Sequence, residues 1–263
     1  MLEFSCHAWA FDDLTLTEAL GTIARLGFRY VDIGSGAHLN LVKAIADVRR
    51  VATDIQSDLR VYNLKLADVA LLLPGISADD ETMRRDEIEQ FKALILLLKA
   101  LGTPGVTLSP GALHPTDADA GYVHVVDALR EMVDAAGDGL TVSIEPQPAT
   151  MARNPNEALA LLMDVPGLKL TVDWAQLTQQ GSATEDIARL LPHTRHVHLR
   201  QTKRDHMQTV LEQGALKLPE VMAALTEARY TGILCVEYSR APAFNHLRET
   251  VKLRDALRAA RPS

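Results

Sequence analysis

Short apolar runs alternate with longer segments of helical periodicity along the chain, and this alternation constrains the fold more than any other feature. The apolar runs lie at residues 2–9, 30–35, 61–69, 105–111, 140–148, 168–177, 194–201 and 232–239. Helix patterns lie at 15–27, 79–102, 154–164, 183–191, 217–229 and 244–260, the first two with clear start and stop signals. This alternation in 263 residues predicts a (β/α)8 TIM barrel, and we expect residues 1–263 to form a single domain.

The alternative architecture for alternating strands and helices is an open, doubly wound sheet. Such sheets commonly carry a glycine-rich phosphate turn after the first strand. The corresponding stretch of this chain reads HAWAFDD, which contains no glycine. The sequence therefore favours the closed barrel.

The composition excludes several classes of protein. A net charge of −7 argues against nucleic-acid binding, which depends on cations that neutralise phosphates. The 2 cysteines cannot form a disulfide framework, and the amino-terminal stretch MLEFSCHAWAFDDL lacks the basic region of a signal peptide. The longest apolar runs stop far short of the ~20 residues that span a membrane. We expect a cytoplasmic protein that binds neither nucleic acid nor a membrane.

Polar side chains end four consecutive strands of the expected barrel. The fifth to eighth strands end in Glu145, Asp173, His198 and Glu237. Each has an ordinary interpretation by itself: a glutamate emerging into solvent, an aspartate capping a helix, a histidine packed in the core. The carboxyl ends of barrel strands meet at one face, however, and three carboxylates that converge there repel one another unless a cation is present.

A divalent metal ion resolves this repulsion. Three carboxylates and one imidazole form an oxygen-rich ligand set, which fits Mn²⁺ or Mg²⁺ best and also admits Co²⁺, Fe²⁺ or Zn²⁺. We therefore expect one divalent ion bound by Glu145, Asp173, His198 and Glu237. Four protein ligands leave coordination positions open for substrate oxygens.

The segment RHVHLRQTKR at residues 195–204 places two histidines two residues apart. His196 and His198 therefore face the same side of the strand. His198 lies nearer the carboxyl end and is the expected ligand, whereas His196 is expected to pack inside the barrel. Arg204 follows in the loop over the mouth, where a guanidinium can bind a substrate oxygen or carboxylate; the alternative is a surface salt bridge.

Several short motifs, in their order and spacing, resemble one known family over nearly the whole chain. They are SIEP, TVDWAQ, HVH with the arginine after it, SADDETMRRDEIE and GALKLPEVMAALTEARYTGILCVE. The chain resembles the xylose isomerase-like TIM barrels, and within them the sugar isomerases and epimerases such as tagatose 3-epimerase and hydroxypyruvate isomerase. The resemblance implies the same metal ligands, with Glu145 and Glu237 on opposite faces of the substrate moving its proton through a metal-bound enediolate. It also implies that Arg204 contacts the substrate.

The sequence departs from these epimerases around the expected substrate. Gln176 stands where they have a substrate-binding histidine, Met151 where they have a glutamate, and Gln201 where an acid is frequent. We expect Gln176 to contact a substrate oxygen, and His7 and Trp9, which end the first strand, either to wall the pocket or to pack in the core. Weaker candidates are His114, expected in a solvated loop, Asp68, His206, and Asp32, expected to be structural.

These features predict a metal-dependent sugar, sugar phosphate or keto-polyol isomerase or epimerase, acting on a small carbohydrate and compatible with a homo-oligomer such as a dimer or tetramer. The alternative is a metal-dependent dehydratase or lyase on an inosose- or dehydroshikimate-like substrate. A sugar-binding barrel without catalysis, and a DNA repair enzyme resembling endonuclease IV, are weaker alternatives. The stretches LKLADV and DWAQL lack the extra histidines of the repair enzymes.

Overall fold

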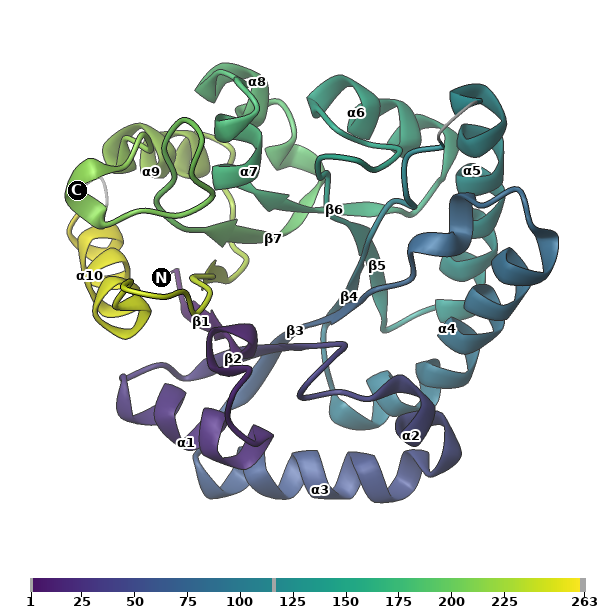
Figure 1. The fold of residues 1–263 in the computed structure, drawn as a ribbon, viewed down its shortest axis with the longest axis horizontal. Helices are drawn as coiled ribbons and strands as arrows, with labels where there is room; N and C mark the ends of the chain where they lie inside the picture. Colours follow the sequence, from purple (N-terminus) through teal and green to yellow (C-terminus); the bar gives the residue numbers. More distant parts are fainter. Residues whose placement is uncertain (1, 115–116, 261–263) are drawn as a thin grey trace.

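The chain forms a closed barrel of parallel strands, which confirms the fold expected from the sequence. The computed structural model describes residues 2–114 and 117–260. Each of the eight strands pairs with its neighbours in chain order, and β1 pairs with β8 to close the barrel. Figure 1 shows the strands around the centre with the helices outside them.

The strands are short, and their carboxyl ends carry the polar residues. They are β1 (Phe4–His7), β2 (Tyr30–Gly34), β3 (Lys65–Leu71), β4 (Gly105–Leu108), β5 (Thr141–Ile144), β6 (Lys169–Asp173), β7 (Thr194–Leu199) and β8 (Leu234–Val236).

The connections between strands contain α-helices and single turns of 3-10 helix. The α-helices are α1 (Leu16–Arg25), α2 (Leu41–Ala46), α3 (Val48–Val61), α4 (Glu81–Leu101), α5 (Ala118–Ala136), α6 (Pro155–Asp164), α7 (Trp174–Gln179), α8 (Thr184–Ala188), α9 (Leu218–Glu227) and α10 (His246–Ala259). The 3-10 turns are η1 (Ala8–Phe11), η2 (Pro74–Ser77), η3 (Leu191–His193) and η4 (Leu211–Gln213). None of the described helices is long and apolar enough to cross a membrane.

The helix signals in the sequence act as expected where they are strong. Thr15 and Glu18 form a capping box at the start of α1, each side chain accepting a hydrogen bond from the other residue's backbone amide. Asp80 accepts hydrogen bonds from two amides at the start of α4, and Gly102 ends that helix in the left-handed conformation, with φ of 69°. These caps define the start of α1 and both ends of α4 before any tertiary contact is considered.

Some boundaries differ from the sequence expectation. The expected strand at 61–69 begins too early, because α3 continues to Val61 and β3 starts at Lys65. The expected strand at 168–177 is too long, because Asp173 ends β6 and also caps α7. The helices α3 and α5 lie in segments for which no helix was expected. Three residues of α3, Ala52, Ile55 and Leu59, are buried at helical spacing, so the apolar periodicity of this helix was present in the sequence.

The interior of the barrel is unusually polar near the amino ends of the strands. Arg195 reaches inward, where its guanidinium donates hydrogen bonds to Asp68 Oδ1 at 2.7 Å and Ser143 Oγ at 2.8 Å. Gly105 makes room for it, because a Cβ atom there would lie 2.6 Å from Arg195 Nε. Thr107 donates a hydrogen bond to Asp68 as well. The apolar core therefore lies mainly between the barrel and its helices, with charge and hydroxyl groups inside.

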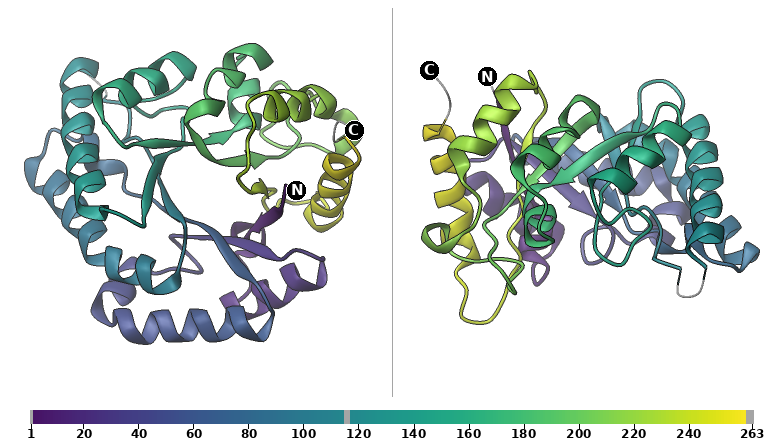
Figure 2. Two further views of the ribbon diagram at one scale, coloured as in Figure 1. Left: turned by 180° about the vertical axis from the view of Figure 1, so that it is seen from behind. Right: turned by 90° about the horizontal axis from the view of Figure 1, so that it is seen from above.

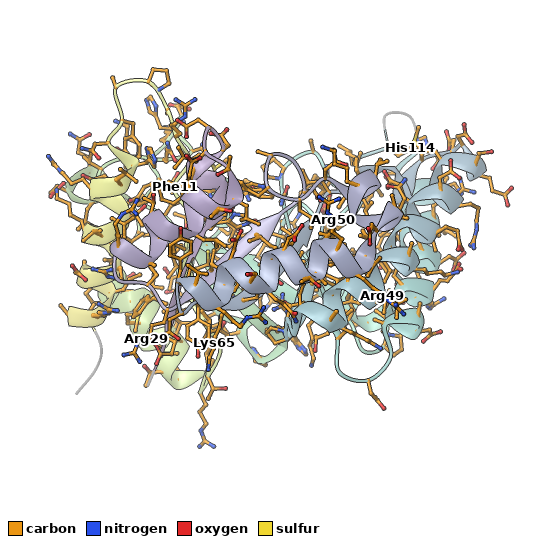
Figure 3. All side chains as sticks on the ribbon, turned by 90° about the horizontal axis from the view of Figure 1, so that it is seen from below. Phe11, Arg29, Arg49, Arg50, Lys65 and His114 are labelled. Atoms are coloured by element: carbon orange, nitrogen blue, oxygen red, sulfur yellow. The ribbon has the colours of Figure 1, made fainter. Side chains whose placement is uncertain are left out.

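The two faces of the barrel are distinct. Figure 3 shows Arg29 and Lys65, at the amino ends of β2 and β3, along one edge of the molecule, with Phe11 and His114, which follow β1 and β4, toward the other. Both termini lie on the same side in the right-hand view of Figure 2. The candidate site described below belongs to the face at the carboxyl ends of the strands.

An ion-pair network joins α4 to α5 on the surface and gives the first testable prediction. Glu131 lies 2.6 Å from both Arg85 and Lys92, and hydrogen bonds from these two residues lower its pKa to about 2. Because the folded pKa lies below the unfolded value, this contribution to stability is present above the unfolded pKa and is lost as pH falls through the folded one. Glu131→Gln should therefore lower the free energy of unfolding by up to about 1 kcal/mol at pH 7, since the network is partly exposed.

The difference between the Glu131→Gln variant and the wild type should shrink as pH falls from about 5 toward 3. Urea unfolding at several pH values measures it. The matched control is Asp127→Asn on the same helix, whose carboxylate lies 3.8 Å from Arg130 and is largely exposed. A pH-independent difference for Glu131→Gln would contradict the ion-pair explanation.

Candidate metal centre

The four strand-end residues expected to bind metal all lie buried at the carboxyl ends of their strands. Asp173 ends β6 and His198 lies near the end of β7, and these two residues are direct neighbours in the sheet. Glu145 and Glu237 directly follow β5 and β8. Because the strands are parallel and adjacent, residues up to 92 positions apart in the sequence, Glu145 and Glu237, reach the same mouth.

Three of these residues form a compact donor set. The ligand atoms of Glu145, His198 and Glu237 all lie within 4.8 Å of one another. His198 Nδ1 lies 3.8 Å from Glu145 Oε1 and 3.4 Å from Glu237 Oε2, and it has no hydrogen-bond partner among the described residues. A buried imidazole nitrogen that faces two carboxylates without a hydrogen bond fits a divalent cation.

Asp173 lies beside this set with both carboxylate oxygens already engaged. Oδ1 accepts a hydrogen bond from the backbone amide of Gln176 at 3.1 Å, which caps α7. Oδ2 accepts one from Arg200 Nη2 at 2.7 Å. For the four-ligand set expected from the sequence to form, Asp173 would have to exchange the contact with Arg200 for a metal ion.

Arg200 is the functional residue that the sequence reasoning missed. Its guanidinium donates to Asp173 and, through Nη1, to Glu237 Oε2 at 2.6 Å, and only 6% of the residue is exposed. The signal was present in the segment RHVHLRQ, because Arg200 continues the two-residue alternation of His196 and His198 and therefore faces the same side of the chain.

The environment separates the pKa values of the two glutamates. Burial raises the pKa of Glu145, and this effect exceeds the lowering contact with His198. Burial would also raise the pKa of Glu237, but His198 and Arg200 outweigh it and hold that pKa well below its usual range. Burial would lower the pKa of His198, but Glu237, Asp32 and Glu145 raise it well above normal.

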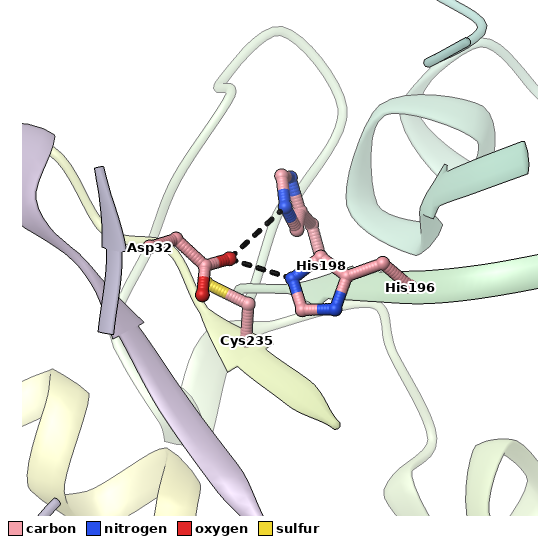
Figure 4. Close-up of side chains that lie close together, drawn as sticks. All are labelled: Asp32, His196, His198 and Cys235. Carbon is pink, nitrogen blue, oxygen red and sulfur yellow. Dashed lines mark hydrogen bonds and ion pairs between the residues drawn. The ribbon is translucent and has the colours of Figure 1, made fainter. Parts of the chain in front are cut away.

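A second polar cluster lies directly beneath His198 in the barrel. Figure 4 shows the carboxylate of Asp32 facing the rings of both His196 and His198, with Cys235 beside it. Asp32 Oδ2 lies 2.6 Å from His196 Nε2 and 3.5 Å from His198 Nε2. A carboxylate that faces one nitrogen of an imidazole fixes the ring orientation and directs the other nitrogen toward a metal. Asp32 thus contacts the imidazoles of both histidines of β7.

The expected substrate residues divide into two groups. Gln176 is buried and donates from Nε2 to Glu145 Oε1 at 2.9 Å. His7 is buried, its ring stacked on Trp9 at 4.1 Å and lying 5.9 Å from the ring of His198. Gln176, His7 and Trp9 therefore lie at or beside the donor set.

Arg204 lies apart from them, exposed in the turn from Lys203 to His206 in the β7–α9 loop. Within the described part of the chain it makes no hydrogen bond or ion pair.

Other candidates have structural surroundings. His114, expected to be solvated, is instead buried. Its Nε2 lies 2.7 Å from Asp79, and its Nδ1 accepts a hydrogen bond from the backbone amide of Asp117. Gln201 is buried and exchanges two hydrogen bonds with the backbone of Leu216, which holds the loop between β7 and α9. Met151 is buried, Asp68 binds Arg195, and His206 is exposed.

A closed parallel barrel with an acidic and imidazole donor set at its carboxyl mouth defines a TIM barrel with a candidate metal centre. The chain belongs to the xylose isomerase-like TIM barrel family, whose model matches residues 20–261. No curated protein shows significant sequence similarity to the chain.

Several solved structures share the fold at low sequence identity. A psicose 3-epimerase with D-tagatose from Clostridium cellulolyticum H10 is 14% identical, with TM-score 0.80, covering 98% of this chain and 99% of that one. A probable 3-DHS dehydratase from Bacillus anthracis is 16% identical, with TM-score 0.78, covering 97% and 99%. A xylose isomerase-like barrel from Mycobacterium smegmatis in complex with magnesium is 19% identical, with TM-score 0.78, covering 99% and 96%. This likeness shows the shared fold.

The buried contacts of Asp32 give a second prediction. Asp32→Ala removes the carboxylate that faces two buried imidazoles and should lower the free energy of unfolding by about 3–5 kcal/mol. Asp79→Ala is the matched control, because it breaks a carboxylate–histidine pair of similar length whose carboxylate is exposed. The Asp79→Ala variant should lower the free energy of unfolding much less than Asp32→Ala does. Chemical denaturation of chelator-treated protein measures both variants, and equal losses would contradict the role assigned to the buried carboxylate.

Proposed function

We propose that the protein is a divalent-metal-dependent isomerase or epimerase of a sugar, sugar phosphate or keto-polyol. The observation that carries the proposal is the convergence of Glu145 and Glu237 on His198 Nδ1 in a buried mouth. Membership of the xylose isomerase-like family supports it, as does the shared fold with an epimerase crystallised with D-tagatose.

Glu145, His198 and Glu237 are the residues that would hold the metal. One nitrogen and several carboxylate oxygens suit Mn²⁺ or Mg²⁺, with Co²⁺, Fe²⁺ or Zn²⁺ as further candidates. The Mycobacterium smegmatis relative in complex with magnesium is consistent with such an ion. When bound, the ion would polarise the carbonyl oxygen of a substrate and acidify the adjacent carbon.

The two glutamates would carry the proton. One carboxylate removes the proton from the carbon beside the substrate carbonyl, giving an enediolate, and the other returns a proton to the opposite face, which inverts that carbon. Return of the proton to the neighbouring carbon gives aldose–ketose isomerisation instead.

The substrate would lie between the glutamates and the side chains beside them. Trp9 and His7 offer an aromatic wall, and burial lowers the pKa of His7 to about 4, so its ring is neutral at pH 7. Gln176 would contact a substrate oxygen next to Glu145. Arg204 would reach the substrate only by movement of the β7–α9 loop, since it is exposed in this structure.

A dehydratase or lyase acting on an inosose- or dehydroshikimate-like substrate is the second candidate. It would use the same proton abstraction, followed by loss of water. The shared fold with the probable 3-DHS dehydratase supports this second candidate function. Mass spectrometry of products from a panel of free ketoses, ketose phosphates and inososes separates the two, because isomerisation and epimerisation leave the mass unchanged.

The third prediction concerns the two glutamates. Glu145→Gln and Glu237→Gln should each slow exchange of the substrate's carbon-bound proton with deuterated water by roughly 10²–10⁴-fold, because an amide cannot act as a base. Nuclear magnetic resonance of the substrate in deuterated water, with metal-supplemented protein, measures the exchange. Glu157→Gln is the control, since that glutamate binds Arg153 on the surface of α6. Near wild-type exchange in either site variant would remove that residue from the proton path.

The fourth prediction concerns Gln176. Gln176→Ala should reduce kcat/KM by roughly 1–3 kcal/mol in transition-state stabilisation, because a buried polar contact is lost. Metal content measured by elemental analysis should stay unchanged, since Gln176 contacts Glu145 but is not itself a donor to the ion. Gln176→His should raise activity toward free ketohexoses, if a histidine there favours them as in the epimerases that the chain resembles. Unchanged kcat/KM in Gln176→Ala would place this side chain outside the substrate contacts.

A further inference from the structure

Arg200 is a buried cation whose position the proposed metal site does not explain. Each nitrogen of its guanidinium has an acceptor. Nη1 donates to Glu237 Oε2 at 2.6 Å and to the Glu237 carbonyl oxygen at 3.2 Å, Nη2 donates to Asp173 Oδ2 at 2.7 Å, and Nε donates to the Met207 carbonyl oxygen at 3.3 Å. The side chain is therefore locked in place by carboxylates on β6 and β8 and by the β7–α9 loop.

This arrangement separates the acidic residues into two classes. Glu145 and Glu237 each have an oxygen within 4 Å of His198 Nδ1, and Asp173 contributes no atom to that donor set. Arg200 also holds this Glu237 oxygen, Oε2, at 2.6 Å, so Glu237 is shared between the guanidinium and the donor set. Asp173 instead has one oxygen on Arg200 and the other on the amide of Gln176. The carboxylate that could serve as a fourth ligand is thus paired with a fixed guanidinium.

The charges support the same division. The three carboxylates Glu145, Asp173 and Glu237 carry three negative charges, which one guanidinium and one divalent ion neutralise together. A buried site of this kind is most favourable when its net charge is close to zero. Arg200 therefore supplies one of the three positive charges that neutralise these carboxylates.

We infer that Arg200 withholds Asp173 from the metal, so that this chain has a three-ligand centre of Glu145, His198 and Glu237 with a built-in guanidinium as its additional cation. The inference rests on the proposed metal-binding function. It makes Arg200 a positioning residue, which holds Asp173 and one oxygen of Glu237 and sets how tightly and with how many ligands the ion is bound.

The test is the affinity of the purified protein for Mn²⁺, measured by isothermal titration calorimetry, together with the visible spectrum of bound Co²⁺. In the wild-type background, Asp173→Asn should weaken Mn²⁺ binding far less than Glu145→Gln does and should leave the Co²⁺ spectrum unchanged. Asparagine keeps an oxygen that can accept the Gln176 amide, so the cap of α7 is preserved.

Removal of the guanidinium should reverse the role of Asp173. Arg200→Met should tighten Mn²⁺ binding roughly tenfold and change the Co²⁺ spectrum, because repulsion is relieved and Asp173 is released as a ligand. Adding Asp173→Asn to Arg200→Met should then weaken Mn²⁺ binding roughly tenfold. This coupling should be absent in the wild-type background. Arg200→Lys keeps the positive charge but lacks the planar guanidinium. Its Mn²⁺ affinity should therefore lie between those of the wild type and Arg200→Met.

The outcomes distinguish the inference from the proposed function. If Asp173→Asn alone weakens Mn²⁺ binding as much as Glu145→Gln, the inference is overturned while the metal site stands, and this result needs no Arg200 variant to fold. If neither the wild type nor Arg200→Met binds Mn²⁺ or Co²⁺, both the inference and metal dependence are overturned. Binding by Arg200→Met but not by the wild type would overturn both the three-ligand centre and the metal dependence of the natural protein.

Discussion

The burial of carboxylates at the mouth of the barrel is the constraint on which the rest of this structure depends. Glu145, Asp173 and Glu237 are at most 7% exposed, and charges so far removed from water need a cation close by. Arg200 and His198 lie close to these carboxylates, and both come from β7 or the residue that directly follows it. The identity and geometry of these cations decide whether the site can hold a metal and move a proton.

Polar contacts continue from the mouth into the barrel and give the site its rigidity. Beneath His198, Asp32 joins the two histidines of β7. Farther down, Arg195 joins Asp68 to the hydroxyl group of Ser143. Most barrels of this class fill this space with branched apolar side chains. Here a column of ion pairs and hydrogen bonds replaces part of that packing and continues up to the ring of His198.

The surroundings of the donor set bear on which reaction the protein carries out. Gln176 touches Glu145, and a glutamine amide offers both a donor and an acceptor but cannot titrate. His7 is neutral at pH 7 and stacked on Trp9. In the proposed reaction, the groups next to the donor set would orient a polyhydroxylated substrate, and the two glutamates would transfer the proton.

The sequence by itself determined the alternation of strands and helices and the strong caps of α1 and α4, because these depend on local periodicity and local hydrogen bonds. It also determined the order of acids and histidine at four strand ends, which the parallel arrangement of the strands brings together. It did not reveal α3 and α5, although both bury residues at helical spacing, or the burial of His114. Only the tertiary structure paired Arg200 with Asp173, 27 positions earlier, and Asp32 with His196, 164 positions later. Such contacts depend on side-chain direction inside a closed barrel, which no local pattern specifies.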